Sequence, residues 1–365
     1  MKDFVFRNDT KLFFRNDIRP TVADICKNEK VMFVYGGGSA LRNGCRNDVI
    51  EAFDNAGIRY VEYGGSSREY AKIEEGIKLA KSENVTMVVG AGGASVMDSA
   101  KLIAFGSQHS ADLWDYVKGK SPYGLEKLRL ALIPTYPSSG SENGLGAVAV
   151  DSRTGDFGTA FGIAADYALL CPKYSLSLDK EMTAYTGLVT LVQLSASVLG
   201  DRNRMSYDAG ISYIKNVLNA TKTLKENPDD LDARGVIMVG AAMSTSSRLG
   251  IGKESQFAYE IYELEFLPEQ LFRSTYRRSL TSIFPRFLSA MGKHHADDIE
   301  KYFSEVYGYE GSIKKSTDRL IELFESFGVP MYYDGKITPE QVAAIPCETE
   351  LSDDEVYGII KSMLI

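Results

Sequence analysis

The sequence is poor in the residues that build metal sites and disulfides. Its 365 residues include only three histidines and four cysteines. The cysteines show no C-x-x-C spacing, so neither a zinc motif nor a disulfide framework is indicated. They are Cys26, Cys45, Cys171 and Cys347. Reduced thiols in the cytoplasm fit this pattern best.

Long apolar runs and clusters of basic residues are also missing. No run of about 18 apolar residues could span a membrane, and Lys2 and Asp3 lie where a signal peptide needs its apolar core. The net charge is −8, and no stretch of lysine and arginine offsets it. Repulsion therefore disfavours nucleic acid and anionic membranes as partners. We expect a cytoplasmic protein that acts on a small molecule.

The first half of the chain alternates between strand-like apolar runs and helical patterns. Strands are predicted at 30–35, 58–63, 85–89 and 128–134, and helices at 47–56 and 69–83. This alternation predicts a parallel sheet with right-handed crossovers, in which ligands gather at the carboxyl ends of the strands. From Pro172 onward the apolar period becomes 3.6 residues, which predicts helices, among them segments near 254–265, 271–291 and 296–307. We therefore expect an α/β domain over 1–172 and an all-helical domain over 173–365.

Small residues follow three of the predicted strands. Gly90-Ala91-Gly92-Gly93 ends the central strand and leads into a helix, so the backbone there is open to a ligand and the helix N-terminus suits a phosphate. Gly36-Gly37-Gly38-Ser39 follows the first strand, and the hydroxyl-rich Thr135–Glu142 follows a later one. Any one of these is also compatible with an ordinary tight turn. Together they predict a phosphate- or sugar-binding edge of the sheet.

These features resemble the iron-containing (group III) alcohol dehydrogenase family, especially its NADPH-dependent butanol dehydrogenase and aldehyde reductase branch. Gly92–Lys101 is similar to the family's G-G-G-S-x-x-D-x-x-K motif, and Thr135–Glu142 is similar to its T-x-x-x-x-G-S-E loop. The resemblance implies a dehydroquinate synthase-like fold with a Rossmann-like dinucleotide-binding domain. It also implies hydride transfer between a nicotinamide and a small alcohol, aldehyde or other carbonyl compound, in a homodimer.

The N-terminus supports the expectation of a dimer in a second way. Phe4–Phe6 and Lys11–Phe14 are strand-like runs on either side of a polar turn and predict a hairpin. Such a hairpin could extend a sheet across a dimer, or it could cover an edge strand of its own sheet.

The resemblance also implies which residues hold the cofactor. Asp98 is expected beside the nicotinamide. The pyrophosphate would lie on the central turn, at Gly92, Gly93, Ala94 and Ser95. The ribose side would lie on the third loop, at Thr135 and Ser138, and the adenosine end on the first loop, at Gly37, Gly38 and Ser39.

The first loop bears on the choice between NAD and NADP. Family members that prefer NAD carry an acid where this chain has Gly38, and Arg42 follows one helical turn later. A missing carboxylate and a nearby guanidinium favour the extra 2′-phosphate, so NADP(H) is the expected cofactor. The alternative is an ordinary dinucleotide fingerprint with Glu62 on the ribose, but the loop lacks the G-x-G-x-x-G spacing.

The metal site is where the chain departs from the family. The family holds a divalent metal with one Asp and three His, which polarises the substrate oxygen. Here Val189 stands at the Asp position and Gln193 at the first His position. Glu260 and Leu264 stand where a later helix of the family carries its pair of histidines. We therefore expect no tightly bound iron or zinc. Glu260 with Gln193 could hold a hard ion weakly, or the two could form a hydrogen-bonded polar pair.

Three functional hypotheses follow. In the first, the protein is a metal-independent NADP(H) reductase in which a side chain of the helical half stabilises the alkoxide, as the family's metal-free maleylacetate reductase branch suggests. The main candidates for catalysis are Tyr259, Glu260 and Tyr262, with Tyr185 and Arg273 also chemically able. In the second, it binds NADP(H) without catalysis and has a regulatory or partner role. In the third, the loops serve another phosphate-bearing ligand.

Overall fold

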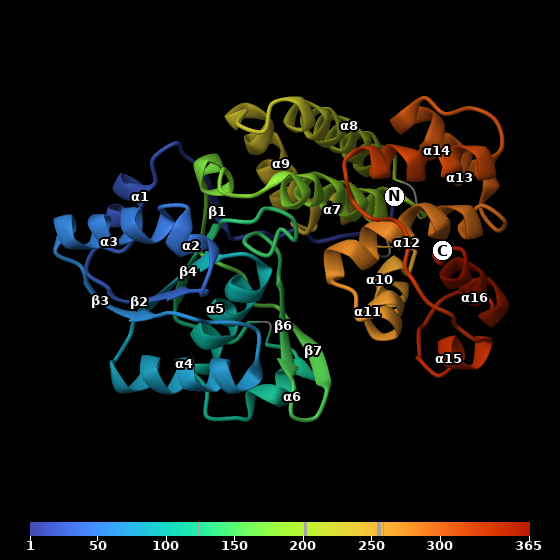
Figure 1. The fold of residues 1–365 in the computed structure, drawn as a ribbon. Coiled ribbons are helices and arrows are strands. Elements are labelled where there is room, and N and C mark those ends of the chain that lie inside the picture. The colour runs from blue at the N-terminus through green and yellow to red at the C-terminus, as the bar shows by residue number, and fades with distance from the viewer. Residues whose placement is uncertain (123, 201–202, 254–256, 258) are drawn as a thin grey trace. The chain divides into compact units, whose positions relative to one another are not determined.

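The computed structural model describes residues 1–122, 124–200, 203–253, 257 and 259–365, and the chain divides into two compact units (Figure 1). The first, termed the α/β unit, comprises Arg7–Leu178 and Asp229–Ser246. The second, termed the helical unit, comprises Met1–Phe6, Asp179–Pro228 and Ser247–Ile365.

These units differ from the two continuous segments expected from the sequence. The α/β unit continues past residue 172 to Leu178 and also includes α9 (Leu231–Ser244). A buried arginine on α9 explains why: Arg234 Nη1 donates to the carbonyl oxygen of Ser175 at 2.5 Å. Amphipathic periodicity identifies α9 as a helix, but it carries no information about which core the helix joins.

A six-stranded sheet forms the centre of the α/β unit, and every strand pair recorded in it is parallel. In spatial order the strands are β1 (Lys11–Phe14), β8 (Tyr167–Leu170), β5 (Arg129–Pro134), β4 (Met87–Gly92), β2 (Lys30–Tyr35) and β3 (Arg59–Tyr63). An antiparallel hairpin, β6 (Gly146–Asp151) with β7 (Asp156–Phe161), lies outside this sheet. The expected parallel α/β architecture is confirmed.

The four inner strands of the sheet are buried on both faces, which explains their continuous apolar runs. In β2, Val31 and Phe33 point into one core, while Met32 and Val34 point into the other. Helices α1 (Arg19–Ile25), α2 (Ser39–Arg42) and α3 (Cys45–Ala56) contribute to the first core. Helices α4 (Tyr70–Ser82), α5 (Ala94–Gly106) and α6 (Leu113–Val117) contribute to the second, and Figure 1 shows α3 and α4 on opposite sides of the sheet. A short 3₁₀ turn, η1 (Pro172–Ser175), follows β8.

The helical unit is organised around α7 (Lys180–Val198), which is buried from Thr183 onward. The other elements are α8 (Arg204–Glu226), η2 (Arg248–Gly250), α10 (Ile261–Leu264), α11 (Phe266–Phe272), α12 (Tyr276–Met291), α13 (Ala296–Tyr307), α14 (Ile313–Ser326), α15 (Pro339–Ala343) and α16 (Asp353–Lys361). Capping boxes at Thr338 and Ser352 start the last two helices. Among the described helices, none is both long and apolar enough to cross a membrane.

The predicted N-terminal hairpin is wrong. Only Lys11–Phe14 forms a strand, and this strand pairs in parallel with β8. Residues before it are held by other contacts: Lys2 N donates to Gly252 O at 2.9 Å, and the Thr10 hydroxyl donates to Ala165 O at 2.8 Å. The segment predicted as a polar turn therefore does not reverse the direction of the chain; through Thr10 it is attached to the α/β unit.

Candidate cofactor site

The three small-residue loops meet at the carboxyl edge of the sheet. They follow β2, β4 and β5, which are adjacent strands. The backbone N–H of Thr135 donates to the carbonyl oxygen of Gly92 at 2.9 Å, and the hydroxyl oxygens of Ser39 and Thr135 lie 2.9 Å apart. The structure thus brings together one predicted cofactor residue from each loop. This convergence is what a dinucleotide site at a parallel sheet requires.

The central turn leaves backbone groups available for an anion. Gly93 is the N-cap residue of α5 and supplies no side-chain cap, so the first N–H groups of this helix lack a capping oxygen. Gly92 tolerates no side chain, because a Cβ there would lie 2.6 Å from Cβ of Val96. Ser95 has a structural contact as well, since its hydroxyl accepts from the backbone N–H of Arg68 at 3.0 Å. The turn therefore combines close packing with a half-buried helix start that has no side-chain cap.

Asp98 is buried on α5 and its carboxylate is already engaged. The Ser141 hydroxyl donates to Asp98 Oδ1 at 2.6 Å, and the backbone N–H of Val148 donates to Oδ2 at 3.3 Å. Burial is the main cause that raises the pKa of Asp98, while Lys101 and the Ser141 hydrogen bond oppose it. The sequence placed Asp98 beside the nicotinamide; the structure shows in addition that it connects α5 to the third loop.

Two further charged groups are buried beside Asp98, and the sequence reading assigned neither to the site. Lys101 donates to the carbonyl oxygens of Gly144 and Gly146, both at 2.8 Å. Burial lowers the pKa of Lys101 to about 8 and raises the pKa of Glu142 to about 7. Lys101 follows Asp98 by one helical turn, and Glu142 is the last residue of the third loop. This proximity to predicted site residues is the feature of the sequence that could have placed both in the site.

The buried carboxyl of Glu142 makes folding dependent on pH. Its folded pKa of about 7 exceeds the ordinary value of 4.5, so its contribution is complete at low pH and is lost as pH rises through about 7. We expect Glu142→Gln to flatten the fall in the free energy of unfolding between pH 4.5 and pH 7. Urea unfolding followed by circular dichroism across this range tests this, and an unchanged slope would contradict it. Glu74→Gln, on partly buried α4, is the control.

An exposed arginine, Arg42, follows the first loop at the end of α2. Its Nη2 lies 3.4 Å from where a Cβ on Gly38 would stand. No carboxylate in the described part of the chain forms an ion pair with Arg42. Glu62, the alternative ribose ligand, is engaged: Arg46 pairs with it at 2.7 Å and the Tyr35 hydroxyl donates to it at 2.8 Å. Gly37 is exposed and Ser138 is buried at the same edge of the sheet.

In the helical unit, the catalytic candidates have different surroundings. The Tyr259 hydroxyl donates to Asp298 Oδ2 at 2.8 Å, and its ring stacks on His295 with centroids 5.0 Å apart, which gives it a packing role. Tyr262 packs edge-on against Phe257. Burial, with smaller effects of Tyr276 and Glu265, raises the pKa of Tyr262 well above 10. Its phenol is therefore a neutral O–H donor at neutral pH.

The remaining candidates are placed as follows. Glu260 is the N-cap residue of α10 and is partly buried. Tyr185 is buried on α7, where burial raises its pKa to about 12. Arg273 is exposed and ends α11 in the left-handed region with φ of 51°. Because of this turn, the single helix expected over 271–291 is two helices. The helix expected over 254–265 is described only in part, since residues 254–256 and 258 lie outside the described residues.

The residues at the family's metal positions do not fit a divalent metal. Val189 is fully buried and offers no donor atom. Gln193 donates through Nε2 to the Tyr276 hydroxyl at 3.1 Å. A neutral amide and a phenol are weak ligands compared with carboxylate and imidazole. Within the described residues, no group of three or more His, Cys, Asp or Glu side chains is arranged to hold a metal ion.

Comparison with known proteins agrees with this fold. A family model described as iron-containing alcohol dehydrogenase matches residues 9–176. A probable NADH-dependent butanol dehydrogenase of Bacillus subtilis is 22% identical over 100% of both chains. The NADPH-dependent aldehyde reductase YqhD of Escherichia coli is 25% identical over 91% of this chain and 88% of the relative.

A solved structure extends the likeness to the whole chain. The crystal structure of NADH-dependent butanol dehydrogenase A from Thermotoga maritima has a TM-score of 0.89 and 24% identity, covering 100% of this chain and 99% of the other. The protein therefore has the fold of the iron-type alcohol dehydrogenases. With the family-model match over residues 9–176, these likenesses confirm that the chain resembles the iron-containing alcohol dehydrogenases.

Proposed function

We propose that the protein is a nicotinamide-dependent oxidoreductase that transfers hydride between the cofactor and a small alcohol, aldehyde or other carbonyl compound. The convergence of the three loops through Ser39, Thr135 and Gly92 is the observation that supports this most. The names of the relatives support the same type of reaction, since they specify a butanol dehydrogenase and an aldehyde reductase. A homodimer in the cytoplasm stays a prediction.

NADP(H) is the proposed cofactor. The names of the relatives include both NADH- and NADPH-dependent enzymes, so the choice rests on this chain's own residues. Arg42 lies over Gly38 without a carboxylate partner among the described residues, and Glu62 is engaged by Arg46. A guanidinium in this position recognises a 2′-phosphate, and no nearby acid is free to repel it.

Removal of the guanidinium tests this cofactor choice. We expect Arg42→Ala to weaken NADPH binding by about tenfold or more, the loss of one charge-assisted hydrogen bond, and to leave NADH binding within about twofold. Nicotinamide fluorescence during titration measures both dissociation constants. Arg59→Ala, an exposed arginine on β3, is the matched control. Equal weakening for both cofactors would contradict the proposal.

The proposed reaction does not use a metal. The positions that hold it in the family carry Val189 and Gln193, so another group must stabilise the developing alkoxide. Tyr262 is the first choice, because its phenol can donate to a carbonyl oxygen and, unlike that of Tyr259, forms no hydrogen bond to a carboxylate within the described residues. Glu260 is the second, and Tyr259 is third because Asp298 accepts its hydrogen bond.

Metal removal tests this mechanism. We expect NADPH oxidation on a panel of aldehydes to continue after dialysis against EDTA, and elemental analysis to find no stoichiometric iron, zinc or manganese. Tyr262→Phe should lower kcat by about 10²-fold without a matching change in the NADPH dissociation constant. Stoichiometric metal with loss of activity on its removal would overturn the metal-free proposal. NADPH binding without turnover on any aldehyde would favour the alternative, a catalytically inactive binding protein.

A further inference from the structure

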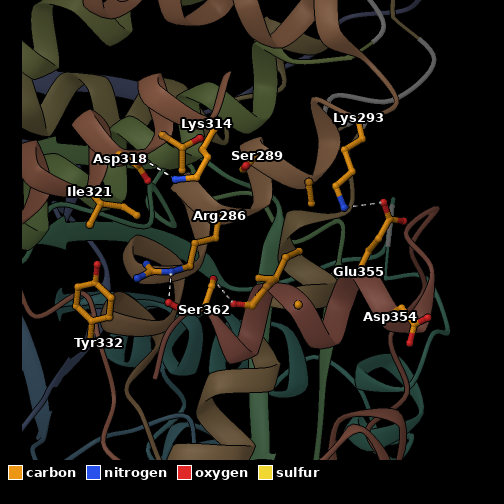
Figure 2. A pocket seen from close by; sticks show the side chains of 14 residues that line it. Arg286, Ser289, Lys293, Lys314, Asp318, Ile321, Tyr332, Asp354, Glu355 and Ser362 are labelled. Atoms are coloured by element: carbon orange, nitrogen blue, oxygen red, sulfur yellow. Dashed lines mark hydrogen bonds and ion pairs between the residues drawn. The ribbon is translucent and has the colours of Figure 1, made fainter. Parts of the chain in front are cut away.

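The helical unit contains a cavity of about 400 Å³ that is separate from the residues considered so far (Figure 2). It is lined by α12, α14, α16 and the segment at Tyr332. None of the cofactor, metal-position or catalytic candidates lines it. Its volume lies within the range of about 300–1,000 Å³ that is usual for small-molecule sites.

A buried arginine on α12 forms one end of this cavity. Arg286 is 5% exposed; its Nε donates to Ser362 O at 3.2 Å and its Nη1 donates to Ser282 O at 2.7 Å. Nη2 makes no hydrogen bond within the described residues. No carboxylate of the described chain forms an ion pair with Arg286 either. The guanidinium is therefore in contact with neutral carbonyl oxygens and the ring of Tyr332, whose centroid is 4.8 Å away, while the Glu325 carboxylate acts on its charge without forming an ion pair.

A second unsatisfied group lines the same cavity. Thr317, on α14, is 5% exposed, and its hydroxyl oxygen has no partner among the described residues. Buried polar atoms in folded proteins nearly always have a partner, so two such atoms in one cavity indicate a bound group. Water could satisfy the two hydrogen bonds, but only an anion would also compensate the buried charge of Arg286.

Charges at the rim define the rest of the ligand. Lys314 lies near Arg286 in Figure 2 and pairs with Asp318 at 2.9 Å. At the other end of the view are Asp354 and Glu355, and Glu355 accepts from Lys293 at 3.4 Å. An anionic group is therefore favoured at the Arg286 end and disfavoured at the Asp354 end. This asymmetry selects a ligand with a single anionic group.

We propose that this cavity binds a small metabolite with one phosphate or carboxylate group, held by Arg286 Nη2 and the Thr317 hydroxyl. The rest of the ligand is neutral or cationic and extends toward Asp354. The Tyr332 ring packs against the guanidinium, so it shifts when the anion reaches Nη2. The site is distinct from the proposed oxidoreductase site, since none of the cofactor-binding or catalytic candidates lines the cavity.

Calorimetric titration of the full chain with inorganic phosphate, and separately with acetate, tests the proposal at constant ionic strength. We expect saturable binding of at least one anion, and the anion that binds identifies the ligand class. Thr317→Val keeps the side-chain size and should weaken binding by about tenfold, because it removes one hydrogen bond to a charged group. Lys315→Gln, on the same helix but outside the cavity, should leave the dissociation constant unchanged.

Two controls keep the result unambiguous. Arg286→Met should abolish binding but could also unfold the chain, since Arg286 satisfies two carbonyl oxygens; Thr317→Val avoids this problem. Phosphate could also bind at the cofactor loops, so the titration is repeated with saturating NADPH. No saturable binding of either anion, binding that NADPH removes, or equal affinity in wild type and Thr317→Val would each overturn the proposal.

Discussion

Lys101→Met is expected to lower the free energy of unfolding by about 3–5 kcal/mol at pH 8, the usual cost of removing one member of a buried ion group. Lys101 is fully buried, donates to the carbonyl oxygens of Gly144 and Gly146, and lies near the buried acids Asp98 and Glu142. Methionine has similar length but leaves Glu142 without a positive neighbour, Asp98 with only Arg68, and the two carbonyl oxygens without the ammonium donor.

The pH dependence of this loss separates its electrostatic part from its packing part. At pH 5 the carboxyl of Glu142, with a pKa of about 7, is protonated, so less charge is left uncompensated and the loss should be smaller. Urea unfolding at pH 8 and pH 5 measures both values. Lys78→Met, an exposed lysine on α4, is the control and should change the free energy by less than about 0.5 kcal/mol. An equal loss at both pH values would show that packing alone is responsible.

Gly92→Ala is expected to disrupt the central turn. The added Cβ would lie 2.6 Å from Cβ of Val96, and a branched residue on a helix cannot move aside cheaply. Overpacking of this kind costs about 1–3 kcal/mol of stability. Because relief of the clash displaces the start of α5, NADPH should also bind at least about tenfold more weakly, which corresponds to about 1.4 kcal/mol.

Neighbouring substitutions show whether the clash is the cause. Gly93→Ala places its Cβ 3.5 Å from the nearest atom, Cβ of Tyr136, so it should fold with near wild-type stability. The double variant Gly92→Ala with Val96→Ala removes the branched side chain and should recover part of the lost stability. Thermal unfolding and NADPH titration of all four proteins provide the comparison. Full tolerance of Gly92→Ala would refute the proposed role of this turn.

Much of the fold is predictable from local patterns. Strands such as Lys30–Tyr35 are apolar from their second residue onward because both faces are covered, and the helix predicted over 296–307 is found with the same limits. Glycine predicted the tight central turn because only a residue without Cβ permits the close approach of Gly92 to Val96. In these cases the residues that carry the signal are also neighbours in the chain.

Other features could not be predicted because they depend on contacts between distant segments. The hairpin expected at residues 4–14 failed because Thr10 finds its partner at Ala165. The hydrogen bond from Tyr259 to Asp298 on α13 could not be predicted for a similar reason. Neither partner has a signature near the residue in question.

The sequence by itself determined the parallel α/β architecture and the three loops at the strand ends, since each depends on residue type and spacing. Only the tertiary structure decided that α9 joins the α/β unit, that Lys101 and Glu142 are both buried, and that Arg286 is buried beside a cavity. The physical reason is burial: the charge state and partners of a side chain follow from what surrounds it, and distant parts of the chain supply those surroundings.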